Sequence, residues 1–206
     1  MKGLLKKDLY MVWAYSKLVL IMVAVFLVVS FFSGDSLFLM LYPIVISAIL
    51  PVTLLSYDER FRWHIYCDAL PIPRRVQVTE KYLLTLIFGA IVFFLLALAH
   101  GIRLLPAGRT DDFLVLLSMM VLFALVSPAL ILPLMFKLGP EKGRLAYFLM
   151  FGLLLVVVIL LTGRTVEDLP QVSGGAGMLL GTLIFGILVF VGSWRLAIHW
   201  YEKREF

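Results

Sequence analysis

The chain has 206 residues, of which 63% are hydrophobic and only 15% are charged. A soluble domain is nearer half apolar and exposes a large share of its surface, so this composition excludes a soluble fold. The formal net charge of +5 could suggest nucleic acid, but the basic residues are distributed as in a membrane protein, and we expect no nucleic-acid partner.

Six apolar blocks without Asp, Glu, Lys or Arg follow one another along the chain. A helix needs about 20 apolar residues to cross a hydrocarbon core about 30 Å thick. The pattern predicts an all-α integral membrane protein with one transmembrane domain, residues 1–206, because six spans leave no room for a soluble domain. The six expected spans are about Leu18–Ser33, Ser36–Tyr57, Tyr82–Ile102, Phe113–Phe136, Leu145–Thr162 and Met178–Trp194.

The first element is the segment that precedes these spans, Met1–Trp13. Its apolar residues recur at helical spacing, with lysines elsewhere on the helix. We expect a short amphipathic helix in the cytoplasmic interface; the alternative is a simple extension of the first span. The apolar residues are Leu4, Leu5, Leu9, Val12 and Trp13.

The second span contains two prolines, Pro43 and Pro51. Proline removes a backbone donor and clashes with the preceding turn, so a kinked helix is predicted. Kinked spans can line a path or move, but they are equally common in membrane helices that have no special role.

The connection between spans two and three, Asp58–Lys81, is the longest polar stretch of the chain. Asp58 and Glu59 suit the N-terminus of a short helix, where the macrodipole favours anions. Prolines at 71 and 73 end that helix, and a second helix is expected from Arg74 into the third span. Two apolar or aromatic faces are predicted, one formed by Phe61, Ile65 and Ala69 and the other by Trp63, Tyr66 and Leu70. One face can lie on the spans and the other is available to a partner; the alternative is an interfacial helix with an aromatic belt.

The basic residues give the orientation. With six spans, both tails and the connections after spans two and four lie on one side, which holds 15 of the 18 lysines and arginines. Arg103, Arg109 and Arg164 lie on the other side. Cytoplasmic segments carry the excess of basic residues, so both termini are predicted to be cytoplasmic.

Several kinds of chemistry are missing from the sequence. There is no phosphate-binding loop of the Walker type, no His-Glu-x-x-His and no Cys-x-x-Cys. The three histidines are far apart, and the apolar blocks hold no carboxylate of the kind that ion-coupled carriers place in the membrane. We therefore expect no catalytic or metal site, and if the protein moves a cargo, the energy comes from a partner.

One set of residues is similar to a known family. A basic N-terminal helix is followed by the order Asp58-Glu59, Trp63, Leu70-Pro71, Arg74 and Lys81-Tyr82. In these features the chain resembles the small six-helix permease subunits of type-2 ABC transporters, which include bacterial exporters. The layout agrees over nearly the whole chain, while the specific residues lie in this loop and at the N-terminus.

The resemblance implies the permease of an ATP-driven exporter in the bacterial cytoplasmic membrane, paired with a second copy or a paralogue. The loop would be a coupling helix that fits a groove on a cytoplasmic ABC ATPase. ATP and magnesium would be bound by that ATPase, so the chain is expected to hold no cofactor and not to be an enzyme. The residues expected to couple to the ATPase are Glu59, Trp63, Tyr66, Leu70, Pro71 and Arg74.

The apolar spans favour amphipathic peptides or lipophilic compounds as the exported cargo. The alternative function is a membrane scaffold or sensor subunit that transports nothing. A third reading, an intramembrane enzyme, would require activity to depend on His100.

The predicted topology can be tested with single cysteines. An impermeant thiol reagent added outside intact cells should label cysteines placed at Ser36, Arg109 and Ser173, because these positions are predicted to lie outside. Cysteines at Lys6 and Lys142 should stay unlabelled, and labelling at Lys142 would contradict the six-span prediction.

Overall fold

The computed structural model describes residues 2–32, 37–69, 73–143, 145–146, 148–149 and 176–203. Within these ranges the chain is helical, with no strand. The prediction of an all-α protein is therefore confirmed for this part of the chain. Its helices are α1 (Lys2–Tyr15), α2 (Lys17–Phe32), α3 (Leu37–Ser47), α4 (Ile49–Arg60), α5 (Trp63–Ala69), α6 (Arg74–Leu104), α7 (Thr110–Leu138) and α9 (Ala176–Glu202).

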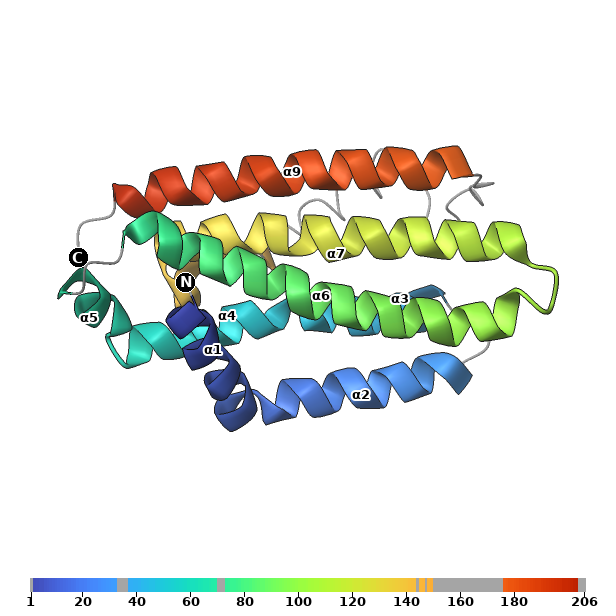
Figure 1. Ribbon diagram of the computed structural model, residues 1–206, viewed down its shortest axis with the longest axis horizontal. Coiled ribbons are helices and arrows are strands. Elements are labelled where there is room, and N and C mark those ends of the chain that lie inside the picture. The colour runs from blue at the N-terminus through green and yellow to red at the C-terminus, as the bar shows by residue number, and fades with distance from the viewer. Residues whose placement is uncertain are drawn as a thin grey trace.

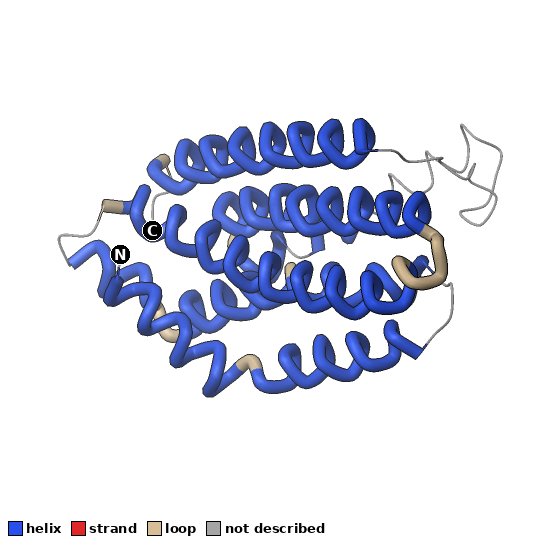
Figure 2. The backbone as a smooth tube through the Cα atoms, turned by 45° about the vertical axis from the view of Figure 1, so that its right-hand side comes forward, coloured by secondary structure: helices blue, strands red, loops and turns tan. Residues whose placement is uncertain are grey.

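The long helices run side by side along one axis, and the short helices α1 and α5 lie at one end of this bundle (Figure 1). Helices α6, α7 and α9 pack against one another, and α2 lies along the bundle beside α3. Helix α1 crosses the end of the bundle at which α4 passes into α5 and at which α6 begins (Figure 2). The segments that the sequence predicts to be cytoplasmic thus lie together.

The expected number of spans is only partly reproduced. In the described residues, four helices are long and apolar enough to cross a membrane, namely Leu41–Arg60, Arg74–Leu104, Thr110–Leu138 and Gly177–Glu202. They correspond to the predicted spans two, three, four and six. The predicted fifth span, Leu145–Thr162, falls almost entirely outside the described residues.

The first predicted span corresponds to α2, whose 16 residues cover about 24 Å of a core about 30 Å thick. It joins α1 at Ser16 with a bend of 74°, and the two helices together count as a fifth candidate span. Because of this bend, α1 does not extend α2 in a straight line. Its position in the membrane interface remains a prediction.

Helices α3 and α4 form the second predicted span, and the chain is interrupted between them at Ala48. Pro51 has no N–H with which to bond the carbonyl of Ser47, so the helical ladder is broken at this turn. Before the break, Ala48 donates its N–H to the carbonyl of Val45 at 3.2 Å, and the Ser47 hydroxyl donates to the carbonyl of Ile44 at 2.7 Å. The predicted irregularity is therefore an interruption one turn before Pro51.

Helix α7 contains Pro128 and Pro133 but runs without interruption. Because Pro133 has no N–H, the carbonyl of Ala129 loses its partner within the helix. The hydroxyl of Ser193 in α9 donates to that carbonyl. The hydroxyl oxygen of Tyr82 in α6 lies 2.7 Å from the hydroxyl oxygen of Ser193. One buried hydrogen-bonded chain therefore joins α6, α9 and α7 at a point that the proline created.

Close helix packing depends on one glycine of α9. A Cβ at Gly186 would come within 2.7 Å of the Leu125 side chain of α7. The glycine therefore lets the two helices approach, as small residues do in membrane proteins. A Cβ added at Gly177 or at Gly181 would have no described atom within 4 Å.

Replacing Ser193 with Ala should destabilise the chain by about 0.5–2 kcal/mol, because the carbonyl of Ala129 then stays buried without a donor. Adding Pro133→Ala should recover most of this loss, since residue 133 regains the N–H that bonds Ala129. Thermal unfolding in detergent measures both. Ser118→Ala is the control, because that hydroxyl bonds a carbonyl of its own helix whose ladder is intact; an equal loss there would contradict the account.

Candidate functional site

The loop predicted to meet a partner begins differently from the expectation. Asp58 and Glu59 lie in the last turn of α4, which ends at Arg60, and not at the N-terminus of the following helix. The expectation was wrong because it considered only the macrodipole, which favours cations at a helix C-terminus. Here two lysines contact Asp58 directly. Arg62 then adopts a left-handed φ of 52° and turns the chain into α5.

Helix α5 presents a different pair of faces from those predicted. Trp63 is half-buried and Cys67, one turn later, is fully buried, so this side faces the protein. Ile65 and Tyr66 point outward, with 53% and 67% of their surfaces exposed. The aromatic rings of Trp63 and Tyr66 are stacked with centroids 6.3 Å apart, so the exposed Tyr66 ring packs on the half-buried Trp63 ring.

The six residues expected to couple to a partner are therefore divided. Tyr66 is exposed, Glu59 and Trp63 are half-buried, and Arg74 lies at the start of α6, where its guanidinium donates to the carbonyl of Glu202 at 3.4 Å. Leu70 and Pro71 lie outside the described residues. For all six residues, the role in coupling to an ATPase remains a prediction.

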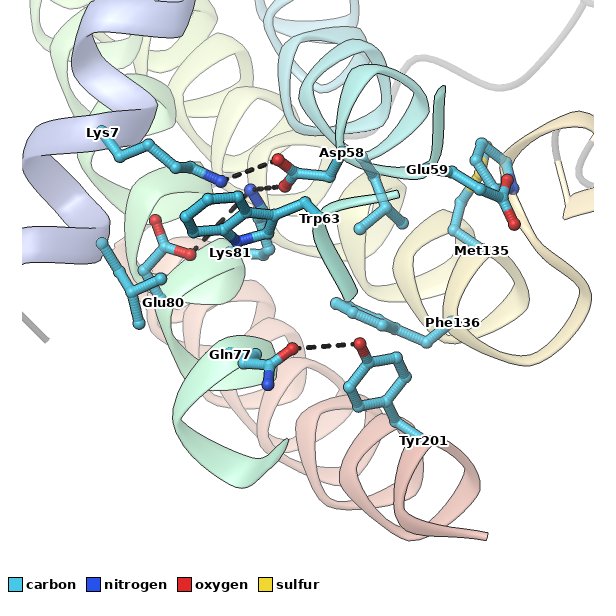
Figure 3. Close-up of a pocket in the computed structure, with 13 residues that line it drawn as sticks. Lys7, Asp58, Glu59, Trp63, Gln77, Glu80, Lys81, Met135, Phe136 and Tyr201 are labelled. Carbon is cyan, nitrogen blue, oxygen red and sulfur yellow. Dashed lines mark hydrogen bonds and ion pairs between the residues drawn. The ribbon is translucent and has the colours of Figure 1, made fainter. Parts of the chain in front are cut away.

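Next to α5 lies a ring of alternating charges that joins α1, α4 and α6. Figure 3 shows its members Lys7, Asp58 and Lys81. Lys7 places its Nζ 2.7 Å from Oδ1 of Asp58 and 2.9 Å from Oδ1 of Asp8. Lys81 contacts the other oxygen of each aspartate, with 2.6 Å to Oδ2 of Asp58. Each aspartate thus binds both lysines, and each lysine binds both aspartates. We call these four residues the ionic ring.

Three members of the ionic ring are buried, and the fourth, Lys7, has 21% of its side chain exposed. Asp8 is 0% exposed, Lys81 4% and Asp58 8%. Transfer of such groups from water costs several kcal/mol per ion, and close pairing offsets that cost. Burial raises the pKa of the Asp8 carboxyl, but the charge of Lys81, a hydrogen bond with Glu80 and the charge of Lys7 outweigh it and hold this pKa below its ordinary value. Asp8 therefore stays ionised and binds the two lysines as a carboxylate.

Trp63 links α5 to the ionic ring. The Nζ of Lys7 lies 4.4 Å from the centroid of the Trp63 ring, which is a cation–π contact. Trp63, Asp58 and Lys81 also line a cavity of about 50 Å³ that is wide enough for water but not for a cargo (Figure 3). Lys7 therefore contacts α5 through an aromatic ring and α4 through a carboxylate.

The start of α6 is tied to the last turn of α9. The guanidinium of Arg75 binds Glu202 at 2.5 Å, and the hydroxyl of Tyr201 donates to Gln77 at 3.1 Å. With the contact of Arg74 on Glu202, this end of α6 is held on two sides, by the ionic ring and by α9.

The residues of the ionic ring were missed as a group by sequence reasoning. One signal was available, because Asp8 shares a helical face with Leu4 and Val12, and an acid on an apolar face needs a buried partner. Lys81 and Asp58 lie just outside the apolar blocks that were counted. Helix α6, with 31 residues, is about 46 Å long and projects beyond a core of about 30 Å, so its first turns carry charge without entering the hydrocarbon.

A family assignment agrees with this architecture. The sequence model of the ABC-2 family transporter proteins matches residues 3–202. The chain belongs to this family. No curated protein and no solved structure matches it significantly. The resemblance stated from the sequence is thus confirmed, and the match spans both α1 and α9 as well as the loop.

Membership of the ABC-2 family makes the chain a multi-pass membrane protein and a permease subunit of an ABC transporter. The family implies an ABC ATPase as partner, and the permease itself is a transport subunit. The described part of the chain holds no group of three or more His, Cys, Asp or Glu side chains able to bind a metal ion.

The ionic ring of this ABC-2 protein should be sensitive to the loss of one member. Lys81→Met leaves two buried carboxylates, Asp8 and Asp58, with the partly exposed Lys7 as their remaining lysine, which should destabilise the chain by about 3–5 kcal/mol. Asp8→Asn added to Lys81→Met should restore part of the loss, because one carboxylate then remains for one lysine. Thermal unfolding of the purified chain in detergent measures both variants.

The control is Arg75→Met, which breaks the exposed ion pair with Glu202. Exposed pairs contribute little to stability, so the thermal midpoint should hardly change. A Lys81→Met chain as stable as the Arg75→Met chain would show that the ionic ring does not hold the three helices together.

Proposed function

We propose that this chain is the membrane-spanning half of an ATP-driven exporter, and that α5 transmits the movement of a cytoplasmic ABC ATPase to the spans. The observation that carries the proposal is the position of α5. Its outer side, with Ile65 and Tyr66, is exposed, and its inner side rests on Lys7 through Trp63. Such a helix can bind a partner on one side and act on the bundle with the other.

The route from α5 to the spans has three steps. A push on α5 reaches Lys7 through the Trp63 ring. Lys7 is paired with Asp58 at the end of α4 and, through Asp8 of its own helix, with Lys81 at the start of α6. The pairs of Lys81 with Asp8 and Asp58 are buried and the pair of Lys7 with Asp58 is partly buried, so separating them costs more than moving them together. Helices α1, α4 and α6 should therefore move as one body at this end of the bundle.

The cargo and the assembly belong to the same proposal. Many large apolar side chains on α2, α6 and α9 are exposed in the single chain, which suits contact with lipid and with a second permease copy. Two copies would form the path between them. Spans with few charged groups favour amphipathic peptides or lipophilic compounds over hydrophilic ions.

Tyr66→Ala tests the docking step. The side chain is 67% exposed and supports little of the fold, so its loss should leave the chain stable but weaken ATPase binding by about 2 kcal/mol, roughly 30-fold, if it is a central anchor. Tyr10→Ala is the matched control, since Tyr10 is also 67% exposed but lies on α1. The affinity of the purified permease for the ATPase that copurifies with it is the quantity to measure, and an equal loss in both variants would contradict docking through α5.

Lys7→Gln tests the transmission step. The variant keeps the exposed side of α5, so the ATPase should still bind. It removes the contact with Trp63 and one cation of the ionic ring, so ATP hydrolysis should continue while cargo efflux falls severalfold. Efflux that remains tightly coupled to hydrolysis in this variant would contradict the proposed route. Absence of any ATP-dependent efflux that requires the native chain would favour a scaffold or sensor.

A further inference from the structure

Helix α1 has a second face, turned away from the ionic ring. Leu4, Asp8 and Val12 are buried at intervals of four residues. On the opposite side Tyr10 and Trp13 expose 67% and 72% of their surfaces. The large apolar and aromatic side chains of α1 are therefore divided between the bundle and the outside.

Two lysines accompany this outer face. Lys6 lies one turn before Tyr10 and close to two turns before Trp13, so the three share one side of the helix, while Lys17 lies at the corner where α1 meets α2. Both lysines are exposed, and in the described part of the chain neither forms an ion pair. This contrasts with Lys7, whose charge is used inside the protein.

We propose that the outer face of α1, formed by Lys6, Tyr10 and Trp13, acts together with Lys17 at the start of α2 to bind the headgroups of anionic phospholipids in the adjoining membrane leaflet. Aromatic side chains prefer the headgroup region, and unpaired lysines beside them attract lipid phosphates. The bend of 74° between α1 and α2 turns α1 across the direction of the spanning helix. In that position the face lies along the membrane surface.

The geometry favours lipid over the other anionic partners. A free phosphate would need donors that converge on a point, whereas Lys6 lies on α1 and Lys17 begins α2, with the rings of Tyr10 and Trp13 between them in the sequence. The ionic ring fixes the inner side of α1, so the helix is already ordered before lipid binds. Binding of lipid to the outer face therefore does not have to offset the conformational entropy of ordering α1. The proposal does not depend on the exporter function, because it concerns the permease chain and lipid alone.

Native mass spectrometry of the purified full chain in detergent can test the proposal. The lipids to compare are phosphatidylglycerol and phosphatidylcholine with the same acyl chains. Lys6→Gln with Lys17→Gln should weaken phosphatidylglycerol binding by about fivefold per lysine, on the order of 30-fold in all. Phosphatidylcholine binding should stay the same, and Lys6→Arg with Lys17→Arg should retain the preference because both charges remain.

The matched control is Arg195→Gln with Lys203→Gln, which removes two exposed cations from the other end of the chain. It should keep the preference for phosphatidylglycerol. An equal loss in both double variants would mean that net charge alone attracts the lipid, and the proposal would be wrong. Full competition by millimolar inorganic phosphate would also overturn it. If the Gln double variant fails to fold, the two single variants carry the same test, with about fivefold expected for each.

Discussion

The arrangement at one end of this bundle depends on a buried ring of two lysines and two aspartates. Lys7 and Asp8 come from α1, Asp58 from α4 and Lys81 from α6, so the ring joins three helices that are far apart in sequence. Lipid tails are as apolar as leucine, so hydrophobic burial alone does not specify how membrane helices pair. Buried ion pairs are costly when broken, and this makes the relative position of the three helices specific.

The same physics explains a second polar contact deeper in the bundle. Pro133 frees the carbonyl of Ala129, and Ser193 and Tyr82 complete its hydrogen bonding from two other helices. The ionic ring fixes α1, α4 and α6, whereas this chain of hydrogen bonds fixes α6, α7 and α9. Helix α6 belongs to both. In the proposed function, α6 would pass a movement at the ring on to α7 and α9.

Much of the fold could be predicted from the sequence, because apolar blocks of span length have few alternatives. The start of α6 at Arg74 and the disturbance near Pro51 follow from backbone chemistry and were predicted. The ionic ring could not be predicted from the sequence, because Asp8 and Lys81 are 73 residues apart and no local pattern pairs them. Trp63 was predicted to face a partner but is half-buried on Lys7, because helical periodicity defines faces without saying which one turns inward.

Hydrogen exchange measured by mass spectrometry tests the central claim that the ionic ring ties α5 and α1 to the bundle. The comparison is between the native chain and the Lys7→Gln variant, both in detergent and without a partner. The account predicts faster exchange of the backbone amides in α1, in the last turn of α4 and in α5, with α7 and α9 unchanged, because only the first three lose contacts. Unchanged exchange in α5 and α1 would contradict the account.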